Sequence, residues 1–500
     1  MRLRFRAMRP LTTLPLPPAT LRVALQRRVA PLARSITAAL ALAAVTAVTA
    51  GSLATLPSGL ALAAMAAGLY PSSASAAKPN NARRGQFQPD PDVLLINVYR
   101  DMAANRLREA LAKSDALVQA YPNFQLGQLI RGDLLLMQTH AVTGFGKAAG
   151  APMDKLDDLR LEAMARLKSL RERPDPSLVP RAIVQLRDDQ KNVLVVDTRR
   201  SRLYMYENQH GQLKLVSDYY VSQGKFGVDK YKEGDGKTPL GVYYITSRLS
   251  GARLPEFYGA GALPISYPNE WDRLQGRSGS GIWLHGTPPA NFSRAPLASD
   301  GCVVLTNQDL QQLYGSIEVL KTPVIISDGV EFVSRAKAAE DRKLAEGLLE
   351  SWQRDLGANL PVTVRSHYSV RFKSEQGDNL DLWLARQVQP ASSLPTVLTM
   401  RDVSFFYYPA KDDVIVATFT QDAKTGRNTV SVRKRQYWVR EGAQWRIISE
   451  TSWQAGGGSK GGGSVPLDPA SAAGTGVGRL KDVGYRVEGG GQGRKTGGRH

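Results

Sequence analysis

The apolar positions that follow the polar segment around residue 85 have a helical spacing. Leu95, Val98 and Met102 recur at steps of three and four residues, which is typical of one face of an amphipathic helix. Pro122 separates this stretch from a second apolar run over residues 126–137. The spacing therefore predicts helices on both sides of Pro122.

A further helix is predicted over residues 154–173, because the apolar positions continue there and Pro174 follows. Residues 92–175 are thus interpreted as a helical module. Its first two helices resemble one hairpin of a tetratricopeptide-like repeat. No second copy at a fixed period is visible, so a solenoid is not expected. We interpret the module as a spacer or packing unit, with docking of a partner protein as the alternative.

The pattern changes to short strands from residue 182 onward. Apolar and β-branched runs occupy residues 193–197, 202–206 and 241–245, and Gly and Pro separate them. A capping box at Thr306 predicts one short helix before the next strand. Residues 182–330 are therefore predicted to form a mostly-β domain.

A long Ala-, Lys-, Glu- and Leu-rich helix is predicted over residues 333–355, and four strands follow it. One helix followed by a meander indicates an α+β domain over residues 335–453. Residues 454–500 hold sixteen Gly in 47 positions, which is typical of a flexible basic tail rather than a fold.

The N-terminal region reads as an export segment. Residues 35–77 contain no charged residue, and Arg28 and Arg34 precede them. The run ends at Ala74-Ser75-Ala76, a small-x-small cleavage pattern. We expect residues 1–77 to be a signal peptide, followed by a linker over residues 78–91 and a mature periplasmic or envelope protein. If the run is retained, it is long enough to span a bilayer, and only then is a membrane contact expected.

Composition and charge exclude several classes of protein. A chain of 500 residues, 42% of them hydrophobic and 22% charged, is a multidomain globular protein. One Cys excludes an internal disulfide and a Cys-rich zinc site, and with five His we predict no metal and no cofactor. Of the net charge of +20, residues 1–34 carry +8 and residues 454–500 carry +4, which leaves +8 for residues 35–453. No nucleic-acid partner is expected from so small an excess.

The single cysteine stands at the start of an apolar strand and one histidine at the end of another, and each lies beside a glycine. Cys302 follows Gly301 and precedes two valines, and His285 precedes Gly286 seventeen residues upstream. A neighbouring imidazole lowers the pKa of a thiol and takes its proton, and backbone N–H groups at a Gly-Cys turn form an oxyanion hole. A lone Cys or His is more often a packing residue, but the paired arrangement favours a nucleophile and its base.

This pairing, with Ser-x-Gly-Cys-Val at residues 299–303, resembles the signature of the L,D-transpeptidases with a YkuD-type domain. Residues 237–243, Lys-Thr-Pro-Leu-Gly-Val-Tyr, resemble the upstream segment of that family. The resemblance implies a mostly-β domain that cross-links peptidoglycan without a metal. It also implies that Cys302 is the nucleophile, that His285 is the base and that the Gly286 carbonyl orients the base. The substrate-pocket positions that it implies are Ser299, Gly301 and Arg294.

One position departs from the family, because Asp300 stands where many members have His or Arg. An acid beside Gly301-Cys302 raises the thiol pKa if it faces the sulfur; we expect it to face solvent or a basic group instead. No Ser-x-x-Lys of a penicillin-binding protein accompanies the Cys. Sortases need an Arg just after their Cys, and residues 303–305 supply none.

Residues 340–453 resemble the nuclear-transport-factor-like, or SnoaL-like, α+β cone, through Trp352, the segment 368–372 and the aromatic strands 434–438 and 445–448. Such a cone offers a pocket, and we interpret it as an accessory that binds a ligand or a partner. No acid/base pair stands out in it.

The expected function is that of a peptidoglycan L,D-transpeptidase, which uses a Cys acyl-enzyme to cross-link stem peptides or to attach proteins to the wall. Two alternatives remain open from the sequence. One is an L,D-carboxypeptidase or hydrolase acting on the same bonds, since the choice of acceptor depends on pocket shape. The other is a non-catalytic wall-binding scaffold. Expected partners are stem peptides, with envelope proteins docking through the helical module or the cone.

Overall fold

The computed structural model describes residues 89–139, 146, 153–387, 397–409 and 413–454, all within one compact unit. The predicted export segment 1–77, most of the predicted linker and residues 455–500 of the predicted tail lie outside these ranges. Over the described residues, no helix is both long enough and apolar enough to cross a membrane.

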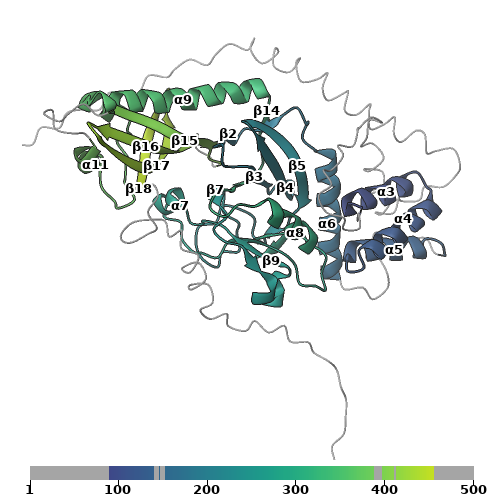
Figure 1. Cartoon of the computed structure of the whole chain (residues 1–500). Helices are drawn as coiled ribbons and strands as arrows, with labels where there is room; N and C mark the ends of the chain where they lie inside the picture. Colours follow the sequence, from purple (N-terminus) through teal and green to yellow (C-terminus); the bar gives the residue numbers. More distant parts are fainter. Residues whose placement is uncertain (1–88, 140–145, 147–152, 388–396, 410–412, 455–500) are drawn as a thin grey trace, which may run out of the picture. The chain divides into compact units, whose positions relative to one another are not determined.

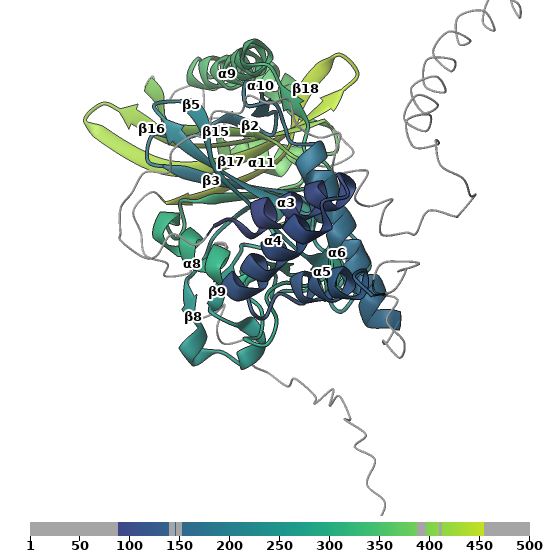
Figure 2. The same ribbon diagram turned by 90° about the vertical axis from the view of Figure 1, so that its right-hand side faces the viewer.

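The helical module is present, but the stretch before Pro122 forms two helices where one was predicted, because residues 104–106 interrupt it. Its helices are α3 (Pro91–Ala103), α4 (Leu107–Ala120), α5 (Gln125–Leu136) and α6 (Met153–Arg171), which lie side by side (Figure 2). The Asp90 side chain caps α3 by accepting from the Asp92 N–H at 2.8 Å, and Pro91 occupies the first turn, where its missing N–H costs nothing. Val98, Leu117 and Ile130 are fully buried between the helices, so the prediction of a helical N-terminal part is confirmed.

The predicted mostly-β domain is also confirmed. Its main sheet has the order β5-β4-β3-β13-β7, and its core includes Leu194, Tyr243 and Ile326, which are all completely buried. Strand β13 runs parallel to β3 and antiparallel to β7. The bounds are β3 (Asn192–Asp197), β4 (Arg202–Gln209), β5 (Gln212–Tyr220), β7 (Gly241–Tyr244) and β13 (Pro323–Ser327).

Shorter elements complete this domain beside the main sheet. A second sheet has the order β12-β10-β9-β8, while β6 pairs with β11 and β1 with β14. The bounds are β1 (Val179–Pro180), β6 (Gln223–Gly224), β8 (Leu249–Ser250), η2 (Gly251–Arg253), η3 (Glu256–Tyr258), β9 (Gly261–Pro264), α7 (Glu270–Leu274), β10 (Trp283–His285), β11 (Leu297–Ser299), β12 (Val303–Val304), α8 (Asn307–Ser316) and β14 (Phe332–Val333). The predicted cap of α8 is present, since the Asp309 N–H donates to Thr306 Oγ1 at 3.1 Å.

The C-terminal part is the predicted α+β cone, in which α9 lies along the sheet (Figure 1). The sheet order is β18-β17-β16-β15-β2. The bounds are α9 (Arg335–Gly357), α10 (Pro361–Ser366), α11 (Leu380–Gln387), β15 (Val397–Tyr407), β16 (Val414–Thr425), β17 (Asn428–Glu441), β18 (Gln444–Gln454) and β2 (Ile183–Gln185). Strand β2 lies in the segment that the sequence analysis assigned to the preceding domain, yet it pairs with β15. The sheet of the cone therefore includes one strand from outside the predicted range 335–453.

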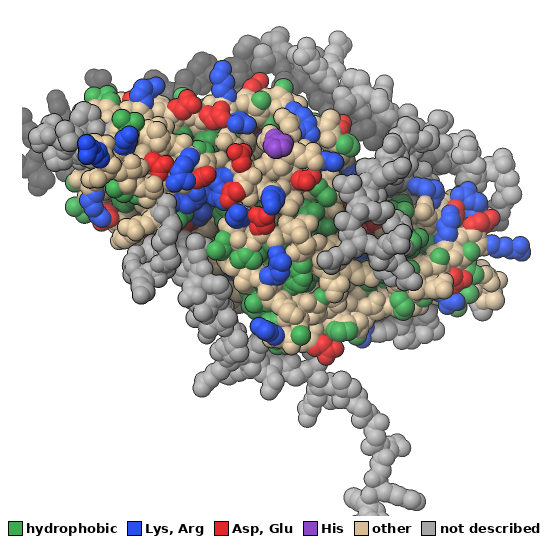
Figure 3. Space-filling model, viewed as in Figure 1, with side chains coloured by type: hydrophobic (Ala, Val, Ile, Leu, Met, Phe, Trp, Pro, Cys, Tyr) green, Lys and Arg blue, Asp and Glu red, His purple; other side chains and the backbone are tan. Residues whose placement is uncertain are grey.

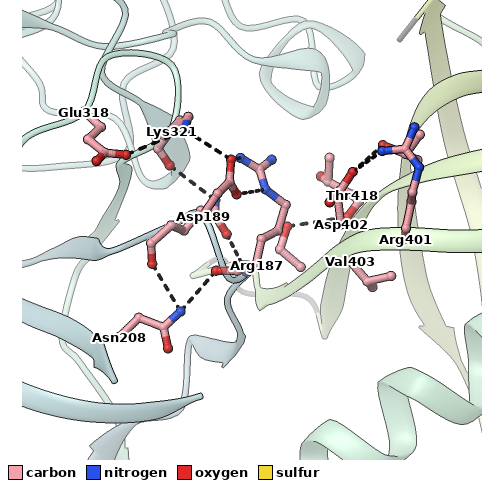
Figure 4. Close-up of polar contacts among 12 residues, drawn as sticks. Arg187, Asp189, Asn208, Glu318, Lys321, Arg401, Asp402, Val403 and Thr418 are labelled. Carbon is pink, nitrogen blue, oxygen red and sulfur yellow. Dashed lines mark hydrogen bonds and ion pairs between the residues drawn. The ribbon is translucent and has the colours of Figure 1, made fainter. Parts of the chain in front are cut away.

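Polar contacts fix the connection from β2 to β3 (Figure 4). Arg187 Nε donates to Asp189 at 2.8 Å, and Lys321 pairs with Asp189 at 3.6 Å. Asn208 Nδ2 donates to the Arg187 carbonyl at 3.0 Å. On the face drawn in Figure 3, side chains of both charge signs are interspersed.

Candidate active site

The pairing of β10 with β12 places the histidine and the cysteine on one side of the second sheet. The two strands are parallel, with Leu284 opposite Val303 and His285 opposite Val304. Cys302 directly precedes β12 and is therefore level with Trp283. Since side chains alternate along a strand, Leu284 and Val303 point into the core, where both are fully buried. His285 and Cys302 share the opposite face as diagonal neighbours.

His285 is oriented by the carbonyl that follows it. Its Nδ1 lies 2.7 Å from the Gly286 oxygen. A carbonyl only accepts, so Nδ1 carries the proton and Nε2 keeps its lone pair. The side chain is 1% exposed. Burial lowers the pKa of His285 from 6.5 to about 4, although the Gly286 hydrogen bond opposes the shift. The imidazole is therefore neutral at physiological pH.

Cys302 carries a partly buried thiol, with Sγ 3.5 Å from the Gly281 carbonyl oxygen. Burial raises the pKa of this thiol to about 11, and the charge of Asp300 adds to the rise. Arg294 and Lys230 act in the opposite direction. The sequence analysis expected the imidazole to lower the thiol pKa. The surroundings instead hold both groups neutral, because each is removed from water.

The turn that carries Cys302 is held by buried hydroxyls. Ser299 Oγ donates to the Cys302 carbonyl at 2.6 Å and accepts the Gly301 N–H at 3.1 Å. Thr238 Oγ1 donates to the Gly301 carbonyl at 3.0 Å and accepts the Gly224 N–H at 2.9 Å. The Gly301 N–H is thus already paired and is not a free oxyanion donor. Ser299 was predicted to line the substrate pocket, but it is 3% exposed and braces the turn.

Gly301 is required by this turn, since its φ is +126° and an added Cβ would lie 2.6 Å from the Lys237 carbonyl oxygen. We expect Gly301→Ala to destabilise the fold by about 1–3 kcal/mol and to slow alkylation of Cys302. Chemical denaturation and thiol alkylation measure the two effects. Gly315→Ala is the matched control, because nothing lies within 4 Å of its added Cβ in α8; its stability should stay equal or rise. Equal stabilities of the two variants would contradict the assignment.

Aromatic rings wall the site on the side of η3. The Tyr258 ring lies 5.1 Å from the His285 ring and 4.9 Å from that of Trp283. The Phe257 ring lies 5.7 Å from the His285 ring. Proximity to Cys302 contributes, after burial, to a raised pKa of Tyr258. No catalytic residue type marks this η3 segment in the sequence, so only the structure shows that it belongs to the site.

Two charged groups flank the thiol. The half-buried guanidinium of Arg294 lies 4.5 Å above the Phe257 ring. Asp300 is 81% exposed and pairs with Lys225 at 2.7 Å. Asp300 therefore faces solvent and a basic group, as the sequence analysis expected.

Asn307, at the start of α8, is a positioning residue that the sequence analysis missed. Its Oδ1 accepts the N–H groups of Ala260 and Thr287, at 2.8 and 3.2 Å, and its Nδ2 donates to the Thr287 carbonyl at 2.8 Å. One side chain thus ties the segment after His285 to the segment after Tyr258. Only the tertiary structure reveals this role, since an Asn at a helix start is ordinarily a cap.

A cavity of about 500 Å³ lies elsewhere, between α7 and the cone. It is lined by Trp271, Gln275, Arg371, Asp413, Val439, Arg440, Gly442 and Ile448. Neither Cys302 nor His285 lines this cavity. Across the described ranges, no three His, Cys, Asp or Glu side chains gather in a way that could hold a metal ion.

Comparison with known families identifies both large domains. Residues 191–326 match the YkuD L,D-transpeptidase catalytic domain, and residues 345–451 match the Cds6 C-terminal NTF2-like domain. The chain contains an L,D-transpeptidase domain followed by an NTF2-like domain. Both the β10–β12 pair and the Ser299–Cys302 turn lie inside the L,D-transpeptidase domain.

Parts of the chain are also similar to individual known proteins. "Putative L,D-transpeptidase YafK" of Escherichia coli K12 is 26% identical over 113 residues, which are 22% of this chain and 41% of that protein. The chain thus spans less than half of that relative's length. The structure of Bdellovibrio bacteriovorus Bd1075 is 25% identical, has a TM-score of 0.50 and covers 56% of this chain and 99% of its own. The helical cell shape determining protein Pgp2 of Campylobacter jejuni is 21% identical and has a TM-score of 0.47. The match covers 54% of this chain and 95% of Pgp2.

Proposed function

We propose that this chain is an exported L,D-transpeptidase of the bacterial cell wall, with Cys302 as nucleophile and His285 as base. The family of its central domain acts on peptidoglycan, which favours the cell envelope as its location. The observation that supports the proposal most directly is the arrangement on β10 and β12. His285 and Cys302 share a face there, and the Gly286 carbonyl leaves Nε2 of the imidazole free to accept a proton.

The proposed reaction begins with a neutral thiol and a neutral imidazole. Sγ of Cys302 attacks the stem-peptide carbonyl that follows the diamino acid, while His285 Nε2 takes the thiol proton. The imidazolium then protonates the leaving nitrogen and the C–N bond breaks. D-alanine leaves, and the stem peptide stays bound to Sγ as a thioester. An amine from another stem or from a protein attacks the thioester and gives a proton to His285. Sγ leaves and recovers that proton, so the enzyme returns to its starting state.

The pH dependence of acylation follows from the low pKa of His285. We expect the acylation rate to fall below about pH 4, where the imidazole is protonated and cannot accept the thiol proton, and to stay level through pH 6–8. The rate of adduct formation with a carbapenem, followed by mass spectrometry, measures this dependence. His285→Ala should lack the acid limb. An acid limb near pH 6.5 in the wild type would contradict the buried, neutral imidazole.

The function is tested with purified mature chain and peptidoglycan fragments of defined stem length, analysed by mass spectrometry. Cross-linked dimers with loss of D-alanine support the transpeptidase. Stems that lose D-alanine without forming dimers, in the presence of excess acceptor amine, contradict transfer to an amine and favour resolution by water. Unchanged stems contradict both reactions. The NTF2-like domain is proposed as a binding accessory. Adding free glycan fragments to the same assay of the intact chain, as competitors for binding to the cone, measures how much this domain contributes to the reaction.

A further inference from the structure

The loop that joins β10 to β11 reaches out of the catalytic domain into the helical module. Phe292 belongs to the buried core of that module. Its ring lies 5.0 Å from the ring of Tyr121 and 4.7 Å from that of Phe124. The Phe292 N–H also donates to the Asn123 carbonyl at 3.2 Å. The loop between the proposed base and the proposed nucleophile is therefore anchored from outside its own domain.

The next loop residue is bound by a buried carboxylate of α6. Ser293 Oγ donates to Glu162 Oε1 at 2.6 Å, and the same oxygen accepts from Arg166 Nε at 2.8 Å. Glu162 and Arg166 are 2% and 1% exposed. Burial raises the pKa of Glu162, and the charge of Arg166 opposes that rise. An ion pair out of water has a sharply defined geometry, so Ser293 has a fixed partner.

The backbone of the following residue is held through one intermediate. The Arg166 guanidinium lies 3.9 Å over the Tyr220 ring. The Tyr220 hydroxyl donates to the Arg294 carbonyl at 2.9 Å. Three consecutive loop residues, Phe292 to Arg294, are thus each restrained by the module or by the ring that Arg166 covers.

The side chain of Arg294 is close enough to the thiol for their charges to interact. Its guanidinium lies over the Phe257 ring, which in turn contacts the His285 ring. The charge of Arg294 favours a lower pKa of Cys302, and it also lowers that of His285. Burial raises the thiol pKa most, and Asp300 also raises it. A hydrogen bond with the Trp283 backbone and the charge of Lys230 lower it.

We propose that the helical module positions Arg294 beside the thiol, so that Glu162, Arg166 and Ser293 are positioning residues for Cys302. The inference rests on the proposed role of Cys302 as nucleophile. It gives the module a task in the chemistry, where the sequence analysis interpreted it as a spacer or packing unit. In this proposal the Arg294 guanidinium stabilises the negative charge that develops on Sγ of Cys302. The contacts with the helical module fix the distance between the two groups.

The test uses the full mature chain, whose only thiol is Cys302. Second-order alkylation rates with iodoacetamide are measured from pH 7 to pH 10, where the rate follows the thiolate fraction. Arg294→Gln and Ser293→Ala should each slow alkylation about threefold to tenfold, which corresponds to a thiol pKa raised by half to one unit. Ser293→Thr should keep the wild-type rate, because it retains the hydroxyl. Asp157→Asn, in an exposed ion pair of α6, is the matched control.

The double variant Ser293→Ala/Arg294→Gln decides between positioning and general loosening. If Ser293 acts through Arg294, the double variant should alkylate no more slowly than Arg294→Gln alone. The proposal would be overturned if the double variant slowed alkylation by the product of the two single effects. An unchanged alkylation rate in Ser293→Ala would also overturn it. Should Ser293→Ala fail to fold, Tyr220→Phe replaces it in the comparison of single and double variants. That substitution removes only the hydroxyl bound to the Arg294 carbonyl. No wall fragment enters this assay, so its outcome is independent of whether the chain turns over stem peptides.

Discussion

Replacing Cys302 with alanine is expected to abolish covalent capture of a carbapenem by this chain. The β-lactam carbonyl is the same kind of electrophile as the stem-peptide carbonyl, and no other thiol exists in the sequence. Cys302→Ser should be nearly as inert, because a hydroxyl stays protonated where a thiol can lose its proton. Mass spectrometry of the intact protein after incubation measures the adduct.

In the same assay, His285→Ala should slow adduct formation about 10²–10⁴-fold, the usual contribution of a general base. The effect is expected to be large because the thiol pKa is raised to about 11, so almost no thiolate exists at neutral pH without a base. His210→Ala is the matched control, since His210 is exposed in the turn between β4 and β5 and should leave the rate unchanged. An undiminished rate in His285→Ala would remove the base from the proposal, and an adduct on Cys302→Ala would remove the nucleophile.

The largest effect on stability is expected from Asp92→Asn in α3. The Asp92 carboxylate pairs with Arg166 of α6 and with Arg202 of β4, and all three side chains are at most 7% exposed. Removing its charge leaves two buried guanidinium groups with less compensation, although Glu162 and Asp218 still contact them. A buried pair that loses one partner costs about 3–5 kcal/mol. Denaturant unfolding of the mature chain measures the loss.

The control and the pH dependence sharpen this prediction. Asp115→Asn breaks an ion pair whose side chains are 40% and 49% exposed, so it should cost at most about 1 kcal/mol. Burial raises the pKa of Asp92, but the two arginines outweigh it and the pKa falls to about 2. The stabilisation is therefore complete above the unfolded value of 3.8 and is lost as the pH falls from about 4 to about 2. Equal losses for Asp92→Asn and Asp115→Asn would contradict the buried network.

The boundaries of the longest elements could be predicted from local pattern alone. The helix expected over residues 333–355 is α9, Arg335–Gly357, and the four strands expected after it are β15 to β18. These elements have long periodic runs with clear ends. The segment from residue 249 to residue 282 could not be assigned, because its strands and helices are two to five residues long and such runs carry too little periodicity.

The sequence by itself determined the types of residue at the site. Cys302 stands just before a strand and His285 at the end of one, each beside a glycine, and a single thiol left one candidate nucleophile. The sequence also determined the order of helical, mostly-β and α+β parts, because periods of 3.6 and 2 residues record which face of each element is buried.

Only the tertiary structure decided how those residues are surrounded. Burial holds the thiol and the imidazole neutral, Ser299 turns inward to brace the loop, and β2 joins the sheet of the cone. The contact of Phe292 with Phe124, and that of Ser293 with Glu162, join residues more than 130 positions apart. A pKa and the position of a loop depend on which groups are close together in space. The residues next to a position in the sequence do not show which distant residues will contact it.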